Sequence, residues 1–278
     1  MDTRTIGYMG PEGTFSHKAA EEYSAQCGGT PVEFATIRAV LAAVKDKTVD
    51  EGIVPIENSI EGGVNQTLDC LAQEEGLYIT GERVISIRQN ILIKKGASRE
   101  DIRVIVSHPQ AVGQCSVILA TEFAGVRVEF ADSTSAAAVR AAESGGEVAC
   151  IGAEENAKLY GLEVLFADCG DKHNNSTRFV TVSGTPSRRV SGHDKTSIAF
   201  ALSNEPGTLY RALKRFADDG INMTKIESRP SKERLGEYVF FVDIEGNIDS
   251  PVIYFALDSI RTNTSFYKFL GSYERAEQ

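Results

Sequence analysis

The feature that most constrains the fold is a regular alternation of short β-forming runs with helical stretches, from the N-terminus to about residue 184. Runs such as "TIGYM" (5–9), "RVIVS" (103–107) and "EVACIG" (147–152) are each followed by a helical stretch. Strands that alternate with helices indicate an α/β architecture with largely parallel sheets. Residues 1–184 are therefore expected to form an α/β domain.

Two segments interrupt this alternation. The stretch "ERVISIRQNILIKK" (82–95) holds two β-rich pieces with no helix between them, and "NNSTRFVTV" (174–182) is a candidate for the return crossing. Two extended crossings divide the domain into two lobes, one of about residues 1–80 plus 172–184 and one of 81–171. A cleft between two lobes is where small ligands usually bind.

The C-terminal part reads as a separate domain. The segment "TPSRRVSGHDK" (185–195) is small, polar and charged, which is typical of a linker. From 196 to 278 the pattern restarts in the order strand, helix, strand, strand, helix, strand. That order predicts a ferredoxin-like βαββαβ unit.

Composition narrows the class of ligand. The 278 residues carry a formal net charge of −10, which argues against nucleic acid as the main partner, because phosphate contacts need clustered Lys and Arg. A small anion would have to be held by local groups that act against the overall field.

Cysteine usage and hydropathy suggest the compartment. The five cysteines include no CxxC pair, and no apolar run approaches the ~20 residues of a membrane span. We therefore expect reduced thiols in a cytoplasmic protein without a membrane partner. The sequence also lacks an HExxH motif or a Cys/His cluster, so we expect no metal.

Four strand-to-helix turns carry polar residues at the expected helix starts: residues 10–16, 55–59, 107–110 and 132–135. Any one of them is consistent with ordinary N-capping. In an open parallel sheet such turns lie at the carboxyl ends of strands, and helix N-termini attract anions. Gln110 and Gln114, four residues apart, either form a solvated helix face or orient a polar ligand.

The segment "NNSTRFV" (174–180) places a hydroxyl, Thr177, beside a permanent cation, Arg178, at the start of a strand. A turn before a strand is the ordinary explanation. The alternative is that both side chains face an anion that also needs a hydrogen-bond donor. The residues alone thus predict a two-lobed binder of a small organic anion and do not name a reaction.

The motifs "GYMGPEGTFSHKAA", "VPIENSIEGGVNQTLD", "SHPQAVGQC" and "NNSTRFV" resemble, in order and spacing, those of prephenate dehydratases. The C-terminal part is similar to the ACT regulatory domain of that family, including "KIESRP" (225–230). The resemblance implies a catalytic domain of the periplasmic-binding-protein-like type II fold. It also implies the reaction of a carbon–oxygen lyase in L-phenylalanine biosynthesis: prephenate gives phenylpyruvate, water and CO2, without a cofactor.

The resemblance also implies residue roles. Thr177 matches the catalytic threonine of the family, and we expect it to donate to the departing hydroxyl oxygen. Arg178 is expected to bind a substrate carboxylate, although its side chain could instead lock the two lobes together. The further substrate contacts are expected at Asn58, Ser107 and Gln114 and, less directly, at Thr14, Ser59, Gln110 and Thr134.

In the ACT part, "NEPGTLYRAL" occupies the place of the family's Gly-Ala-Leu loop, with Thr208 instead of the alanine. With "ESRP" it implies a site for L-phenylalanine as feedback inhibitor, formed across a subunit interface of a homo-oligomer, either a dimer or a homotetramer. The residues of this site are expected to be Asn204, Gly207, Thr208, Leu209, Glu227, Ser228, Arg229 and Pro230.

Two alternatives stay open at this point. Some members of the family dehydrate arogenate, the aminated relative of prephenate, directly to phenylalanine. A more remote alternative is a non-catalytic sensor of small anions, in which a two-lobed binder is fused to an amino-acid-binding domain.

Overall fold

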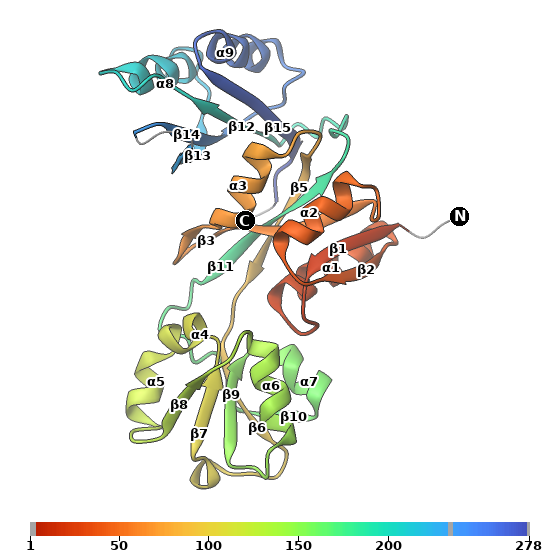
Figure 1. Cartoon of the computed structure of the whole chain (residues 1–278), viewed down its shortest axis with the longest axis vertical. Coiled ribbons are helices and arrows are strands. Elements are labelled where there is room, and N and C mark those ends of the chain that lie inside the picture. The colour runs from red at the N-terminus through yellow and green to blue at the C-terminus, as the bar shows by residue number, and fades with distance from the viewer. Residues whose placement is uncertain (1–3, 233–235, 277–278) are drawn as a thin grey trace. The chain divides into compact units, whose positions relative to one another are not determined.

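The computed structural model describes residues 4–232 and 236–276 of the chain (Figure 1). Tertiary contacts divide the chain into two compact units, one of residues 1–36, 57–62 and 85–177 and one of 37–56, 63–84 and 178–278. The strands that cross the boundary are β3 (Glu51–Asn58), β4 (Gly62–Gly63), β5 (Tyr78–Ser86) and β11 (Ser176–Ser183). The lobe and linker limits drawn from the sequence stay predictions.

The first unit is built around a five-stranded sheet with the order β10-β6-β9-β7-β8. The strands of this sheet are β6 (Asn90–Lys94), β7 (Val104–Ser107), β8 (Arg127–Phe130), β9 (Val148–Gly152) and β10 (Leu162–Phe166). The unit also contains β1 (Thr5–Met9) and β2 (Thr30–Phe34), which pair with each other in parallel. Its helices are α1 (Phe15–Cys27), η1 (Arg99–Asp101), α4 (Pro109–Gln114), α5 (Ser116–Thr121), α6 (Thr134–Glu143) and α7 (Glu154–Tyr160).

The expectation of largely parallel strands holds for only part of this sheet. Strand β7 is parallel to β8 and β9, whereas β6 is antiparallel to both of its neighbours. Strand β10 was not anticipated from the sequence, and the helical stretch that follows "RVIVS" forms two short helices, α4 and α5, with Cys115 between them.

Helices cover both faces of the five-stranded sheet, and each face has its own core (Figure 1). Neighbouring strand residues point to opposite faces, so Leu92 packs towards α6 and α7 while Ile91 packs towards α4 and α5. This double coverage explains why the strands read as continuous apolar runs in the sequence.

Local sequence fixes the helix ends near the candidate turns. The Thr14 hydroxyl accepts the N–H of His17 (3.2 Å) and caps α1, which ends at Gly28 in the left-handed conformation (φ 71°). Pro109 occupies the first turn of α4, where its missing N–H costs no hydrogen bond. Side-chain caps are therefore present at three of the four turns, through Thr14, His108 and Ser133, whereas residues 55–59 belong to β3 and the turn after it, and α3 begins only at Asn65 without a side-chain cap.

The second unit contains helices α2 (Ile37–Lys45) and α3 (Asn65–Gln73) and the whole C-terminal domain. The elements of that domain are β12 (Asp194–Ala201), α8 (Thr208–Asp218), β13 (Met223–Pro230), β14 (Tyr238–Glu245), α9 (Pro251–Thr262) and β15 (Phe266–Glu274). The βαββαβ order and the antiparallel sheet β13-β14-β12-β15 confirm the ferredoxin-like fold.

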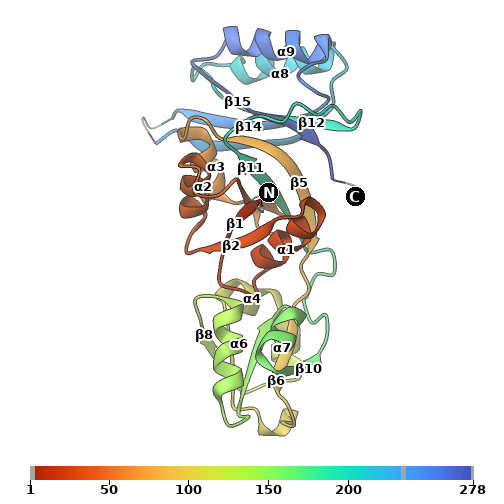
Figure 2. The same cartoon turned by 90° about the vertical axis from the view of Figure 1, so that its right-hand side faces the viewer.

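Helices α8 and α9 lie on one face of this four-stranded sheet, as Figure 2 shows. Apolar residues of both helices pack against that face, among them Phe216, Ile253 and Leu257. The opposite face carries buried polar side chains, including Lys195, Ser197 and Asp243. No helix in the described ranges is long and apolar enough to cross a membrane.

Candidate active site

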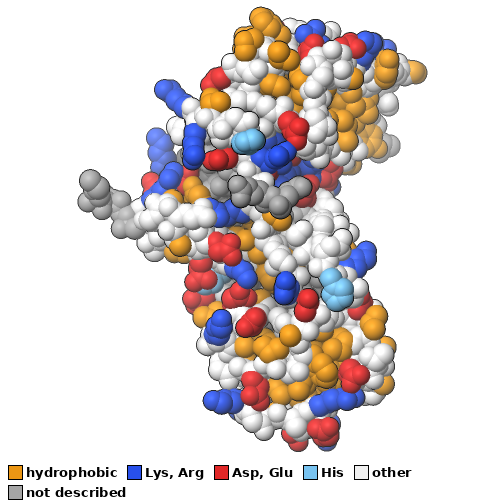
Figure 3. Space-filling view, turned by 180° about the vertical axis from the view of Figure 1, so that it is seen from behind, with side chains coloured by type: hydrophobic (Ala, Val, Ile, Leu, Met, Phe, Trp, Pro, Cys, Tyr) orange, Lys and Arg blue, Asp and Glu red, His pale blue; other side chains and the backbone are white. Residues whose placement is uncertain are grey.

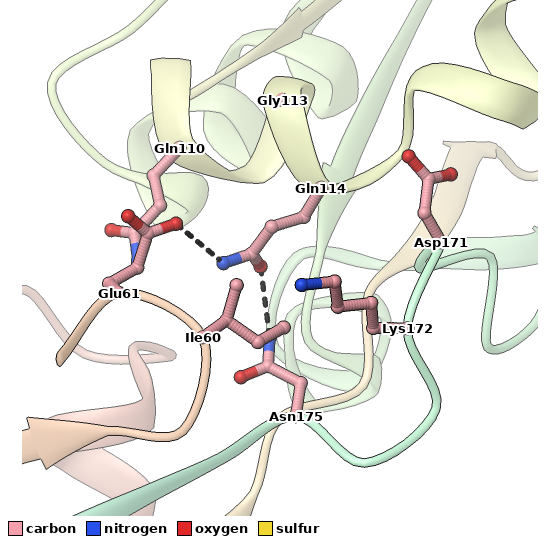
Figure 4. Close-up of a pocket in the computed structure, with 8 residues that line it drawn as sticks. All are labelled: Ile60, Glu61, Gln110, Gly113, Gln114, Asp171, Lys172 and Asn175. Atoms are coloured by element: carbon pink, nitrogen blue, oxygen red, sulfur yellow. Dashed lines mark hydrogen bonds between the residues drawn. The ribbon is translucent and has the colours of Figure 1, made fainter.

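A pocket of about 410 Å³ opens in the first unit, where the turn after β3, helix α4 and the segment before β11 meet (Figure 4). It is lined by Ile60, Glu61, Gln110, Gly113, Gln114, Asp171, Lys172 and Asn175. Two of these residues, Gln110 and Gln114, belong to the set expected from the sequence.

Asn58, at the end of β3, links this pocket to Thr177. Its Oδ1 accepts the backbone N–H groups of Ile60 (2.9 Å) and Glu61 (3.1 Å). Because a backbone N–H can only donate, these bonds fix which end of the amide is oxygen. Its Nδ2 therefore donates, and it lies 2.9 Å from Thr177 Oγ1 and 2.8 Å from Asn175 Oδ1.

The donor and acceptor ends of the next two amides, Asn175 and Gln114, follow from those of Asn58. Asn175 accepts from Asn58 through Oδ1, so its Nδ2 donates to Gln114 Oε1 at 3.0 Å. The Nε2 of Gln89 approaches that oxygen at 3.4 Å. The Nε2 of Gln114 is thereby left to face the pocket and Glu61 Oε1 (3.4 Å), and Figure 4 shows both bonds of Gln114.

The hydroxyl of Thr177 takes its role from this network. Its oxygen accepts from Asn58, so its own hydrogen is available for another acceptor. Within residues 4–232 and 236–276, Asn58 is the only hydrogen-bond partner of this hydroxyl. The half-buried Thr177 is therefore arranged as a hydrogen-bond donor towards a ligand.

Ser59 holds Asn58 against the start of β11. Its backbone N–H donates to Ser176 O (2.9 Å), and its Oγ donates to Asn174 O and accepts the N–H of Ser176, both at 3.0 Å. These three bonds join the turn after β3 to the strand that carries Thr177. The structure thus gives Ser59 a positioning contact rather than a free hydroxyl.

The remaining candidates of the first unit lie outside the pocket lining. Ser107 is fully buried, and its hydroxyl donates to Ile151 O at 2.7 Å. Thr14 caps α1, and Thr134 is the first residue of α6, which is capped by Ser133. The structure therefore brings Asn58, Gln114 and Thr177 into one network. The hydroxyl of Ser107 already donates to a backbone carbonyl, and Thr14 and Thr134 lie at helix starts.

Arg178 differs from its expected place as a carboxylate ligand. Its guanidinium donates to Glu82 Oε2 (2.8 Å) and to Asp243 Oδ2 (2.7 Å), and its side chain is 7% exposed. Successive residues of a strand point to opposite sides, which separates Arg178 from its neighbour Thr177. Arg178 therefore has a structural role inside the second unit, where Glu82 and Asp243 also lie, rather than the lock between the two lobes that was the alternative; its contact to a substrate carboxylate stays a prediction.

The cluster around Arg178 is closely balanced in charge. Glu82 also accepts from Lys195 Nζ at 2.8 Å, and Asp243 accepts from Ser197 Oγ at 2.6 Å. The cluster connects strands β5 and β11 with β12 and β14 of the ferredoxin-like domain. Such buried pairs add little net stability over apolar residues, but removal of one partner is costly because it leaves an uncompensated charge.

Six of the eight lining residues were not expected from the sequence, and two of them, Asn175 and Lys172, are central to the site. Asn175 has a signal in the sequence, since it lies two positions before Thr177 and the strand alternation places both on one side. Lys172 has none, because an isolated lysine in a polar loop has no periodic pattern.

The loop 204–209 of the second unit lines a smaller pocket of about 390 Å³. Gly207 adopts the left-handed conformation (φ 81°) at the start of α8. The hydroxyl of Thr208 lies 3.0 Å from Ser203 O and 2.9 Å from Glu205 O. That hydroxyl is therefore occupied by its own loop, which explains how threonine is accommodated here.

The "ESRP" residues on β13 make different contacts. Arg229 pairs with Asp69 of α3 (3.0 Å), and Glu227 pairs with Lys225 (3.1 Å). Arg229 and Pro230 line a cavity of about 920 Å³ that is separate from the pocket of Gly207 and Thr208, while Asn204 borders both. Within one chain, Gly207, Thr208 and Leu209 thus line one of two adjoining cavities and Arg229 and Pro230 the other, while Glu227 and Ser228 line neither.

Comparison with known proteins identifies relatives of both regions. Residues 6–187 match the family model described as Prephenate dehydratase, and residues 196–261 match the ACT domain. A curated relative from Amycolatopsis methanolica named Prephenate dehydratase is 38% identical, over 98% of this chain and 89% of its own length. An Arabidopsis thaliana relative named Arogenate dehydratase/prephenate dehydratase 2 is 35% identical, over 96% of this chain and 72% of its own length.

The fold has a close solved counterpart. The crystal structure of a prephenate dehydratase from Arthrobacter aurescens in complex with L-Phe has a TM-score of 0.89 and 33% sequence identity. It covers 98% of this chain, and this chain matches 90% of it. Both the catalytic and the ACT regions are therefore within the matched range.

Proposed function

The chain belongs to the prephenate dehydratase family, and from that premise we propose that it converts prephenate into phenylpyruvate, water and CO2. The observation that carries the assignment of residues is the hydrogen bond from Asn58 to Thr177, because it makes the Thr177 oxygen an acceptor and leaves its hydrogen free to donate. The pocket lined by Gln114 and Asn175 lies along the same network and would receive the substrate.

The reaction needs a proton at one end of the ring and no redox step. The bond between the ring and its carboxylate breaks, and the electron pair moves into the ring. The bond from the opposite ring carbon to the hydroxyl breaks, the ring becomes aromatic, and the departing oxygen takes up one proton to give water. Prephenate dianion plus a proton thus yields phenylpyruvate anion, CO2 and water.

Hydroxide is a poor leaving group, so the main task of the site is to hydrogen-bond the departing oxygen as negative charge develops on it. We assign that donor role to Thr177, with water as the ultimate proton source. A well-placed donor of this kind contributes about 10²–10³ in rate. Binding that aligns both leaving groups supplies much of the rest.

We predict that Asn175→Ala lowers kcat by about 10–100-fold with little change in KM. Asn175 accepts from Asn58 and donates to Gln114, so its loss removes one partner from each amide and loosens the network that orients Thr177. Steady-state kinetics with prephenate measures both constants. A change confined to KM would remove Asn175 from this positioning role.

The neighbouring residue supplies the matched control. Asn174 is exposed and contributes only its backbone carbonyl to Ser59, so Asn174→Ala keeps that contact. Its kcat should match the wild type. Thermal unfolding of both variants separates a catalytic loss from a folding loss.

The assay that tests the proposed function follows the absorbance of phenylpyruvate after addition of prephenate. The alternative substrate is arogenate, which the Arabidopsis relative names in its description. Comparison of kcat/KM for prephenate and arogenate decides between the two. Turnover of neither would leave the non-catalytic sensor as the remaining hypothesis.

We also propose that L-phenylalanine inhibits the reaction through the ACT domain. The relative of known structure binds L-Phe, and here Asn204, Gly207 and Thr208 line a pocket of about 390 Å³. The proposed site combines this pocket with the "ESRP" segment of a second subunit, because within one chain the loop residues and Arg229 line two adjoining cavities rather than one. Millimolar phenylalanine should lower activity by about 5–150-fold, the usual range of allosteric coupling. Unchanged activity would reject this regulation.

A homo-oligomer through the ACT domains and a cytoplasmic location complete the proposal. Hydrophobic side chains are exposed on the ACT region, at the top of Figure 3, and Tyr254 and Phe255 of α9 are 53% and 61% exposed. Such a surface is typical of an interface between subunits. The five cysteines, all described, are free, which supports a reducing compartment.

A further inference from the structure

The proposed substrate is a dianion, and the cation that was expected to bind it, Arg178, is already engaged. Its guanidinium pairs with two buried carboxylates, Glu82 and Asp243. The net charge of −10 gives no general attraction for an anion. The residues that line the pocket are therefore the place to look for another cation.

Lys172 is the only cation among the eight residues that line the pocket, and Figure 4 shows its side chain directed into it. In the described part of the chain, its ammonium makes no hydrogen bond or ion pair. Its charge is therefore available to a ligand in the pocket.

The backbone beside Lys172 is firmly held. Asp171 accepts the N–H groups of Ser116 and Val117, both at 3.0 Å, and donates its own N–H to Gln114 O at 2.7 Å. Burial alone would raise the pKa of the Asp171 carboxyl, but the hydrogen bonds from Ser116 and Val117 outweigh it and hold that pKa low. The anchored Asp171 thus fixes the point from which the Lys172 side chain extends.

The two sides of the pocket differ in charge. Glu61 lies against Gln114 Nε2 on one side, and its carboxylate repels an anion there. Lys172 extends towards Gln114 and Asn175 on the other side, where the second carboxylate of the lining, Asp171, already accepts hydrogen bonds from Ser116 and Val117. The anionic end of a ligand is therefore favoured beside Lys172.

We infer that Lys172 binds the side-chain carboxylate of prephenate and makes this enzyme prefer the keto acid over arogenate. This inference rests on the proposed function. The ring carboxylate loses its charge in the transition state, so a cation that held it would stabilise the ground state and slow the reaction. The side-chain carboxylate keeps its charge throughout, and a cation there gives uniform binding.

The same placement explains discrimination. In arogenate an ammonium group replaces the keto oxygen, on the carbon that bears the side-chain carboxylate. A lysine that pairs with this carboxylate lies close to that ammonium, and like charges repel. Repulsion of an unwanted substrate is a common source of specificity.

The test is Lys172→Met, with Lys95→Met as a control that removes one positive charge from an exposed lysine outside the pocket lining. In Lys172→Met we expect KM for prephenate to rise about tenfold while kcat stays within about threefold, because a charge-assisted hydrogen bond between the exposed Lys172 and a bound carboxylate contributes on that order. KM for arogenate should stay equal or fall, and Lys172→Arg should restore most of the preference. A Lys172→Met enzyme with the prephenate and arogenate constants of Lys95→Met overturns the inference.

Calorimetric binding of phenylpyruvate separates this inference from the proposed function. Phenylpyruvate keeps the side-chain carboxylate and lacks the ring carboxylate. If the wild type turns over neither substrate but binds phenylpyruvate about tenfold more tightly than Lys172→Met, the site stands and the proposed reaction fails. Equal phenylpyruvate affinity in the two proteins, or no binding to either, overturns the role of Lys172.

Discussion

Thr177→Val should lower kcat for prephenate by about 10²–10³ while KM stays within a few-fold of the wild type. Valine is close to threonine in shape, so the pocket keeps its form, but the departing oxygen loses its donor. The structure supports this split because the Thr177 hydroxyl accepts from Asn58 at 2.9 Å and has its hydrogen to give. Steady-state kinetics with prephenate measures both constants.

Thr177→Ser is the matched control for this result. Serine keeps the hydroxyl and loses only the methyl group, so most of the activity should remain. Near-normal turnover by the valine variant would exclude Thr177 as the donor, whatever the serine variant does.

Arg178→Met should lower the free energy of unfolding by about 3–5 kcal/mol, because it leaves Glu82 and Asp243 buried with one cation fewer. In a protein of this size such a loss lowers the midpoint of thermal unfolding by roughly 10 °C. The cost arises from uncompensated charge, so the further change Asp243→Asn should recover part of it. Thermal unfolding of the single and double variants measures both effects.

Arg188→Met, at an exposed arginine, is the control and should unfold at the wild-type temperature. One result for Arg178→Met would contradict this structural role. Unchanged stability together with a KM for prephenate raised tenfold or more would return Arg178 to the role of a carboxylate ligand.

Much of the fold follows from local patterns in the sequence. The strand Thr5–Met9 and the βαββαβ order of the C-terminal domain are visible as apolar runs and turn residues. The antiparallel course of β6 and the edge strand β10 are not, because pairing partners are set by tertiary packing rather than by local propensity.

The candidate site was predictable in the same measure. Asn58 and Thr177 stand in recognisable motifs, and the structure joins them by a hydrogen bond. Arg178 stands in the same motif, but its partners are 96 and 65 residues away in sequence, and no local pattern indicates a buried pair of that kind. Lys172 could not be predicted from the sequence either, because nothing in the sequence distinguishes it from other exposed lysines in loops.

The central claim is that Asn58 and Thr177 act as one unit, in which the amide orients the hydroxyl that donates to the departing oxygen. The most direct measurement is kcat for prephenate in Asn58→Ala, Thr177→Val and the double variant, which together form a double-mutant cycle. If the unit exists, Asn58 has no hydroxyl left to orient in the valine variant, so its further removal should cost little. The double variant should then match the kcat of Thr177→Val within about threefold. Losses that multiply in the double variant would show that the two residues act independently and would contradict the claim.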